Sequence, residues 1–123
     1  ESLRWESPVQ QIFRKTTAEV NFGGSTIPAE SRVMLCFAAA NRDPRRWENP
    51  DKFDLTRDPS GHLSFGMGMH QCVGQHAARL QAASLLEKLI PRVKSIELAA
   101  PIGRQHNNTL RGLKSVPLRL TLA

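Results

Sequence analysis

The clearest pattern of apolar positions lies in the stretch GQHAARLQAASLLEKLI, where small and aliphatic residues recur every three or four positions among polar ones. Ala78, Leu85 and Leu89 fall on one face at the spacing of an α-helix. Pro91 lacks the backbone donor that a helix interior needs, so it limits the element. The pattern predicts one long helix over about 73–90.

Shorter stretches have the composition of β-strands. Residues 10–22 are rich in β-branched and aromatic side chains with partial alternation, and the pair at 23–24 is Gly-Gly, a turn signal. Residues 33–37 form a continuous apolar run, which predicts a more buried strand. Residues 117–123, PLRLTLA, alternate between apolar and polar positions. Together these stretches predict small antiparallel sheets.

The remaining segments predict little regular structure. ESLRWESP, at residues 1–8, is typical of the last turns of a helix that closes before a proline. Residues 39–47 predict a short helix followed by a basic loop, and residues 48–64 are rich in Pro, Asp and Gly, as in an extended meander. The fold class is therefore α+β. Because the chain opens inside an element, we interpret it as part of a longer protein.

Composition narrows the class of protein. The 123 residues are 40% hydrophobic and 23% charged, as expected for one globular domain. No apolar run has membrane-spanning length, and no signal-peptide pattern opens the chain, so with only two cysteines we expect a cytoplasmic protein without membrane contact. The net charge of +6 favours an acidic partner. A basic nucleic-acid binder is one alternative, but no nucleic-acid-binding motif accompanies the charge.

The stretch FGMGMHQCVG, residues 65–74, places Cys72 just before the predicted helix. At that end unpaired backbone N–H groups and the positive end of the helix dipole favour a thiolate. The surrounding glycines allow a bulky neighbour to approach the backbone. A thiolate beside such a surface suits an iron held in a flat cofactor. A structural cysteine or a nucleophile remains open at this point, whereas zinc is disfavoured because no CxxC is present.

Three motifs carry a resemblance to the cytochrome P450 family. FGMGMHQCVG is similar to that family's cysteine loop, Phe-x-x-Gly-x-x-x-Cys-x-Gly, at Phe65, Gly68, Cys72 and Gly74. Glu-x-x-Arg at residues 1–4 and NPDKFD at 49–54 resemble two further motifs in the same order. The resemblance implies that residues 1–123 are a single C-terminal fragment of a haem-thiolate monooxygenase domain. The expected fold is the C-terminal part of a mainly α architecture, with small antiparallel sheets, a meander, the cysteine loop and one long helix.

At finer grain, ANRDPRRWENPDKFDLTR, CVGQHAARL and NNTLRGL resemble the bacterial branch that oxidises para-substituted benzoates such as 4-methoxybenzoate. This implies that the whole enzyme inserts one oxygen atom from O2 into an aromatic acid, with electrons from NAD(P)H through a [2Fe-2S] ferredoxin. The oxygen-activating helix of the family precedes the Glu-x-x-Arg motif, so the isolated chain is expected to be inactive. The alternative is a truncated, non-catalytic module that folds alone and self-associates, for example as a dimer.

The resemblance also implies roles around the cofactor. Cys72 is expected to be the metal ligand, the proximal thiolate of haem b, and the only catalytic residue within this chain. The other residues expected to contact haem are Arg14, Phe65, Gly66, His70 and Gly74. Of these, Arg14 and His70 are expected to bind the haem propionates.

Further residues are expected to serve substrate, fold and partner. The substrate-lining residues are expected to be Val9, Ile12, Phe13, Thr109 and Leu110. Glu1 and Arg4 are expected to form a structural salt bridge, and Lys52 stands where many members carry an arginine, which predicts a looser three-member network. The arginines expected near a ferredoxin-docking face are Arg45, Arg46, Arg79 and Arg92.

Overall fold

The computed structural model describes every residue, 1–123, and the chain divides into two compact units. The first unit comprises residues 1–64 and 107–111, and the second comprises residues 65–106 and 112–123. The helices, 3-10 turns included, are α1 (Ser2–Glu6), α2 (Phe37–Ala40), η1 (Gly68–His70), α3 (Gln75–Leu89) and η2 (Ile90–Arg92). The strands are β1 (Ile12–Lys15), β2 (Val20–Phe22), β3 (Ser25–Ile27), β4 (Arg32–Leu35), β5 (Val93–Leu98), β6 (Gly103–Gln105), β7 (Gly112–Ser115) and β8 (Leu118–Leu122).

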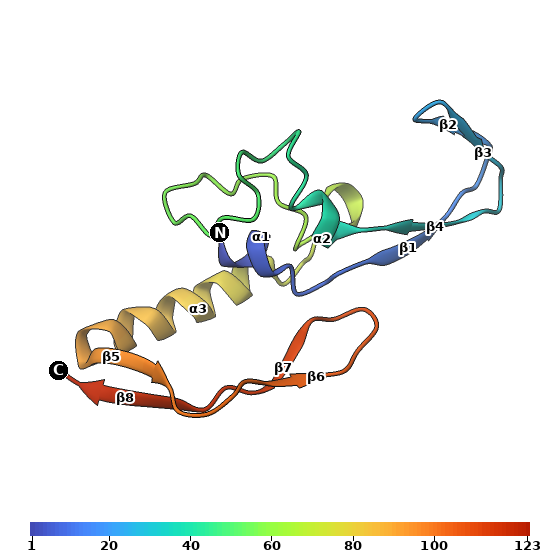
Figure 1. The fold of residues 1–123 in the computed structure, drawn as a ribbon. Helices are drawn as coiled ribbons and strands as arrows, with labels where there is room; N and C mark the ends of the chain where they lie inside the picture. Colours follow the sequence, from blue (N-terminus) through green and yellow to red (C-terminus); the bar gives the residue numbers. More distant parts are fainter. The chain divides into compact units, whose positions relative to one another are not determined.

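In the first unit, β1 pairs antiparallel with β4, and this ribbon carries the β2–β3 hairpin beyond its end (Figure 1). Gly23 and Gly24, at φ 57° and 78°, make the tight turn that the sequence predicts. The strand predicted over 10–22 is interrupted after Lys15. There the Thr16 hydroxyl donates to the carbonyl of Pro28 at 2.7 Å and accepts from the backbone N–H of Ser31 at 2.9 Å, so the side chain takes part in closing the bend.

The interior of the first unit is mostly polar. Arg4, Ser7, Asn41 and Ser64 are buried, and Trp47 is the only buried hydrophobic residue of the chain. Every buried side-chain nitrogen and oxygen has a hydrogen-bond partner. Since a buried polar group is costly unless it is hydrogen-bonded, this interior depends on a complete network rather than on apolar burial.

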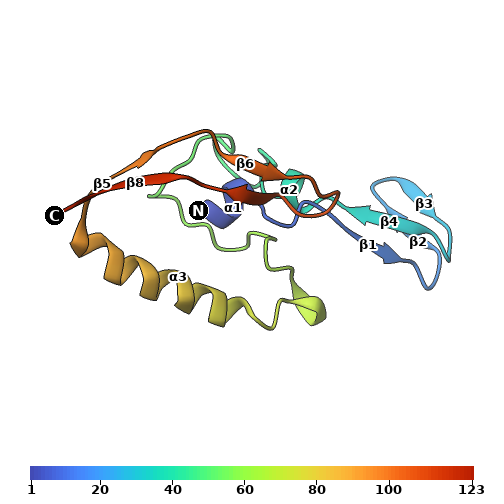
Figure 2. The same ribbon diagram turned by 90° about the horizontal axis from the view of Figure 1, so that it is seen from below.

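The second unit contains the long helix and two two-stranded sheets, β5–β8 and β6–β7 (Figure 2). The predicted helix over 73–90 is confirmed as α3, and the chain continues through η2, which contains Pro91, directly into β5. The alternating stretch 117–123 is confirmed as β8, which pairs with β5. The Pro, Asp and Gly-rich stretch 48–64 contains no helix or strand, as expected of a meander.

Most of the large apolar side chains are exposed in both units. The run 33–37 is a strand only as far as Leu35, and it is not buried, because β4 pairs with β1 alone and Met34 and Leu35 remain exposed. The helix predicted within 39–47 lies earlier, at α2, and ends at Ala40. No helix has both the length and the apolar character needed to cross a membrane.

Candidate functional site

The cysteine loop of the second unit is closed by its own backbone. The N–H of Cys72 donates to the carbonyl of Phe65 at 2.7 Å, and the 3-10 turn η1 lies between them. Gly66 and Gly68 both adopt φ of 68°, a conformation that side chains disfavour. An added Cβ at Gly66 would also lie 3.1 Å from the carbonyl oxygen of His70. The loop therefore needs glycine at residue 66 for both conformation and space.

The sulfur of Cys72 lies at the start of α3 and is exposed. The carbonyl of Cys72 accepts from the N–H of Gln75, the first residue of the helix, at 3.3 Å. An added Cβ at Gly74 would contact the sulfur at 3.8 Å, so glycine leaves this side of the sulfur open. Met69 and Val73 beside it are almost fully exposed, at 94% and 99%. The loop thus presents an exposed thiol among exposed residues, of which Met69 and Val73 are large and apolar.

This geometry fits a planar cofactor that contains iron. Cys72 is a free cysteine and offers one exposed sulfur donor, which is enough for a metal whose remaining protein-independent ligands are supplied by a macrocycle. The glycines and exposed apolar side chains around the sulfur could contact the flat face of such a group. Residues Phe65, Gly66, His70 and Gly74 all belong to this loop, whereas Arg14 lies in β1 of the first unit.

The side chains expected to flank the cofactor differ in their surroundings. Phe65 is partly buried, and the guanidinium of Arg79 lies over its ring, 5.2 Å from the centroid. His70 is exposed at the end of η1. Arg14 is exposed and donates to the carbonyl of Phe13 at 2.9 Å. Arg14 also borders an apolar pocket of about 250 Å³ together with side chains such as Val33.

The Glu-x-x-Arg pair is the centre of the buried polar network, and the predicted salt bridge is present. The guanidinium of Arg4 binds the carboxylate of Glu1 through two hydrogen bonds of 2.8 Å. It also donates to the carbonyls of Asn41 and Pro50 at 2.7 and 2.9 Å. Arg4 is fully buried, so this forked geometry ties the first helix to the meander.

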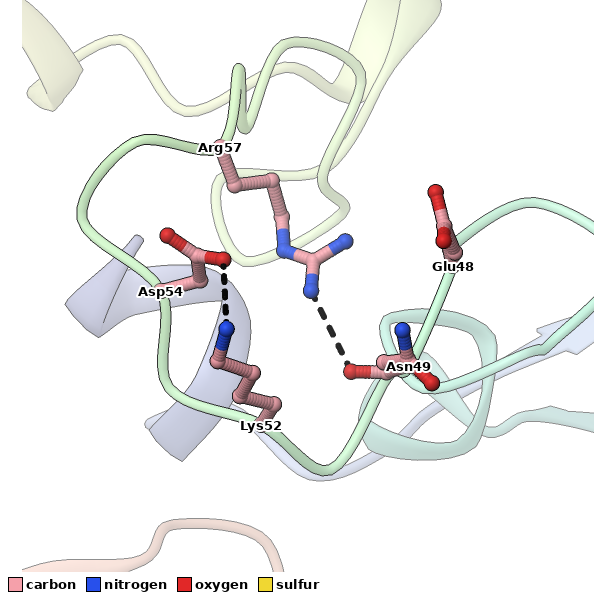
Figure 3. Close-up of a pocket in the computed structure, with 5 residues that line it drawn as sticks. All are labelled: Glu48, Asn49, Lys52, Asp54 and Arg57. Atoms are coloured by element: carbon pink, nitrogen blue, oxygen red, sulfur yellow. Dashed lines mark hydrogen bonds and ion pairs between the residues drawn. The ribbon is translucent and has the colours of Figure 1, made fainter.

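The third member of this network is Arg57, which corrects the prediction made for Lys52. Arg57 Nε lies 3.3 Å from the Glu1 carboxylate, and its side chain is only 13% exposed. The ammonium of Lys52 instead pairs with Asp54 at 3.3 Å, and these two residues line a pocket together with Arg57 (Figure 3). Lys52 serves the network through its backbone carbonyl, which accepts from Arg4 at 3.3 Å. The network therefore has an arginine in place and is not loosened by the lysine.

The network stabilises the ionised form of Glu1. The hydrogen bonds from Arg4 lower the pKa of Glu1 from 4.5 to about 2, with further help from the N–H of Asp54 and from Arg57. Burial acts in the opposite direction but does not prevail. The carboxylate is therefore a permanent anion at neutral pH, matched by buried cationic partners.

Asn41 and Ser64 are two further structural residues, which are not among those expected from the sequence. The Asn41 amide donates to the hydroxyls of Ser7 and Ser64 at 2.9 and 3.0 Å, and its oxygen accepts from the N–H of Leu63 at 2.7 Å. The Ser64 hydroxyl donates to the carbonyl of Leu3 at 2.6 Å. The signal available was a polar residue, Asn41, directly after the apolar stretch of α2.

The structure brings together three of the five expected substrate-lining residues. Val9 and Leu110 form an antiparallel bridge, and the carbonyl of Thr109 accepts from the N–H of Gln10 at 2.8 Å. Ile12 and Phe13 follow along β1, where the guanidinium of Arg32 lies 4.0 Å from the ring centroid of Phe13. Two segments far apart in the sequence thus share one edge of the first unit.

The arginines expected at a docking face are partly engaged. Arg45 binds the carboxylate of Asp43, and this lowers the pKa of Asp43 to about 2. Arg46 donates to the carbonyl of Ser60 at 2.9 Å and stacks over the ring of Trp47. The charge of Arg45 is therefore locally balanced by Asp43, whereas Arg46 keeps its positive charge because its acceptor is a neutral carbonyl.

The chain is similar to known proteins in both sequence and structure. The family model described as "Cytochrome P450" matches residues 1–114. The chain is 51% identical over 123 residues to the protein "Cytochrome p450 CYP199A2" of Rhodopseudomonas palustris, covering all of this chain and 30% of that relative. It is 42% identical to "Cytochrome P450-terp" of a Pseudomonas species, again over the whole chain and 29% of the relative. The chain therefore spans less than a third of the length of these curated relatives.

Solved structures agree with the sequence matches. The crystal structure of CYP108D1 from Novosphingobium aromaticivorans is similar with a TM-score of 0.92 and 42% identity, covering 99% of this chain and 30% of that one. A complex of P450BioI with an acyl carrier protein carrying hexadec-9Z-enoic acid is similar with a TM-score of 0.91 and 39% identity, covering 97% and 31%. These matches cover the small sheets, the meander, the cysteine loop and the long helix.

Proposed function

Because the chain belongs to the cytochrome P450 family, we propose that it supplies the thiolate side of a bacterial haem monooxygenase, with Cys72 as the iron ligand. The observation that carries this proposal is the exposed Cys72 sulfur, held at the start of α3 by a closed, glycine-containing loop. When bound, haem b would supply the activation of dioxygen and the transfer of one oxygen atom to the substrate.

The chain's own residues would hold and tune that cofactor. The Cys72–Phe65 backbone hydrogen bond closes the loop that carries the thiolate, and the Phe65 ring would pack over this loop and shield the sulfur. His70 and Arg14 each offer N–H donors of the kind that propionates accept. Their assignment to the haem propionates is supported by their positions relative to Cys72 in the family's pattern.

The whole enzyme is proposed to act on an aromatic acid such as 4-methoxybenzoate, by demethylation or hydroxylation. This substrate class is supported by the subfamily stretches in the sequence and by 51% identity to the Rhodopseudomonas palustris relative. Electrons are proposed to come from NAD(P)H through a ferredoxin that binds the basic side of the protein, where charge complementarity would speed encounter. Two unpaired cysteines support a cytoplasmic location.

The proposal is tested in a chimaera in which this chain replaces the matching 30% of the Rhodopseudomonas palustris relative. We expect the dithionite-reduced chimaera to give a thiolate-type absorbance band with carbon monoxide, and the Cys72→Ser variant to lose it. Cys36→Ser is the matched control, because Cys36 is the other exposed free cysteine. A band that survives in Cys72→Ser would contradict the proposal.

A further inference from the structure

Residues 8–11 and 108–111, which we name the clip, are held together by consecutive contacts. The N–H of Gln10 donates to the carbonyl of Thr109, and the N–H of Arg111 donates to the carbonyl of Pro8, both at 2.8 Å. The Gln11 amide donates to the carbonyl of Asn108 at 3.3 Å, although the two residues lie 97 positions apart. The clip thus fixes two distant segments in one register.

The second segment of the clip, residues 108–111, is also held by a local turn. The side-chain oxygen of Asn107 accepts from the N–H groups of Thr109 and Leu110, each at 2.8 Å. Such a turn limits the conformations that the following residues can adopt. The backbone at Thr109 and Leu110 is therefore restrained both by this turn and by its contacts with residues 8–11.

An ion pair ties the clip to the first helix. Arg111 Nε lies 2.8 Å from the carboxylate of Glu6, with side chains 43% and 32% exposed. Glu6 is the last residue of α1, and Ser7 after it adopts φ of 44° and is buried. The Ser7 hydroxyl donates to the carbonyl of Arg4 at 2.9 Å. The buried network therefore fixes the position of Glu6, and the ion pair with Glu6 in turn restrains the side chain of Arg111.

From these contacts we propose that Glu6 and Arg111 are positioning residues that set substrate affinity by fixing the clip. The proposal rests on the proposed function, since it takes Val9, Thr109 and Leu110 of the clip as substrate-facing. Glu6 and Arg111 do not themselves need to touch substrate. Loss of their ion pair would let the segment 108–111 shift against residues 8–11, so the substrate-facing side chains would lose their register.

The test is a double-mutant cycle in the chimaera, with 4-methoxybenzoate as the titrated probe. Glu6→Gln and Arg111→Gln should each raise its Kd about fivefold, as the loss of a partly exposed ion pair implies. The double variant should be no weaker than either single variant, because one interaction is lost in all three. Arg111→Lys, which keeps the cation, should restore most of the affinity.

Imidazole separates positioning from general damage, because it is a small ligand that binds haem iron directly. Its Kd should be the same in all variants, and Glu30→Gln, which removes the exposed Lys15–Glu30 pair elsewhere in this unit, should change neither affinity. Additive effects of Glu6→Gln and Arg111→Gln, equal losses for imidazole, or an unchanged Kd for 4-methoxybenzoate would overturn the inference. Absence of the carbon monoxide band in the unmutated chimaera would instead overturn the proposed function, and the inference with it.

Discussion

Arg57 Nε lies 3.3 Å from the carboxylate of Glu1, although 56 positions separate the two residues in the chain. Together with Arg4 this contact joins the first helix to the meander through charged groups that are almost fully buried. Removal of one partner from such a pair leaves charge without compensation, which is more costly than loss of a surface pair.

Arg57→Ala in the chimaera should therefore lower the free energy of unfolding by about 2 kcal/mol, the contribution of hydrogen bonds to a buried charged group. Lys52→Ala is the matched control and should cost less than about 1 kcal/mol, because its ammonium pairs with Asp54 in solvent. Urea unfolding followed by circular dichroism measures both values. Equal losses of stability in the two variants would contradict the assignment of Arg57, rather than the Lys52 side chain, as the third member of the network.

The low pKa of Glu1 makes the free energy of unfolding depend on pH in the acidic range. The folded chain holds this pKa at about 2, below its ordinary value of 4.5, so the unfolded chain takes up the proton first as pH falls. The stabilisation from Glu1 should be complete above about pH 5 and decline from there to about pH 2. Glu1→Gln should flatten this part of the profile of unfolding free energy against pH, and a variant that retains the full slope would contradict the assignment.

Gly66 and Gly68 of the cysteine loop have the same φ, but they differ in the room available for an added Cβ. Gly66→Ala must accommodate a Cβ 3.1 Å from the carbonyl of His70, whereas Gly68→Ala meets nothing within 4 Å. Both variants should lose stability from the left-handed backbone, by about 1 kcal/mol, and Gly66→Ala should lose more. Haem release on heating, followed by absorbance, should occur at a lower temperature for Gly66→Ala. The reverse order would show that contact with His70 is unimportant.

The chain by itself should self-associate and give no monooxygenase product. Large apolar side chains are exposed on both units, and exposed apolar patches of this kind favour association. Size-exclusion chromatography should show dimers or larger species, and purified chain with haem, ferredoxin and its reductase should not convert 4-methoxybenzoate. Measurable product from the isolated chain would refute this expectation, and a monodisperse monomer would show that the apolar faces can remain in water.

The sequence predicts the features that depend on neighbours along the chain. The spacing of Ala78, Leu85 and Leu89 predicts α3, and Gly23-Gly24 predicts the β2–β3 hairpin. The cysteine motif likewise places Cys72 at the start of a helix because loop and helix are contiguous.

Features that depend on distant partners could not be predicted in this way. Nothing local to Arg57 indicates that Glu1 is its partner, and the family resemblance points instead to Lys52, which is closer to Glu1 in the sequence. The apolar run at 33–37 indicates a strand, but burial depends on what covers it, and in this chain β4 has only β1 beside it. Similarly, the contact between the segments 8–11 and 108–111 follows from the path of the chain and not from either segment's composition.

Because Trp47 is the only buried hydrophobic residue, the unfolding of the isolated chain should have a distinct calorimetric profile. The heat-capacity increase on unfolding arises mainly from newly hydrated apolar surface, and in this chain most of that surface is hydrated before unfolding begins. Melting of the isolated chain as a monomer should accordingly be broad, with a small heat-capacity step for its length. Joined to the remainder of a P450, the same residues should add a large step, since their apolar faces would then leave water on folding.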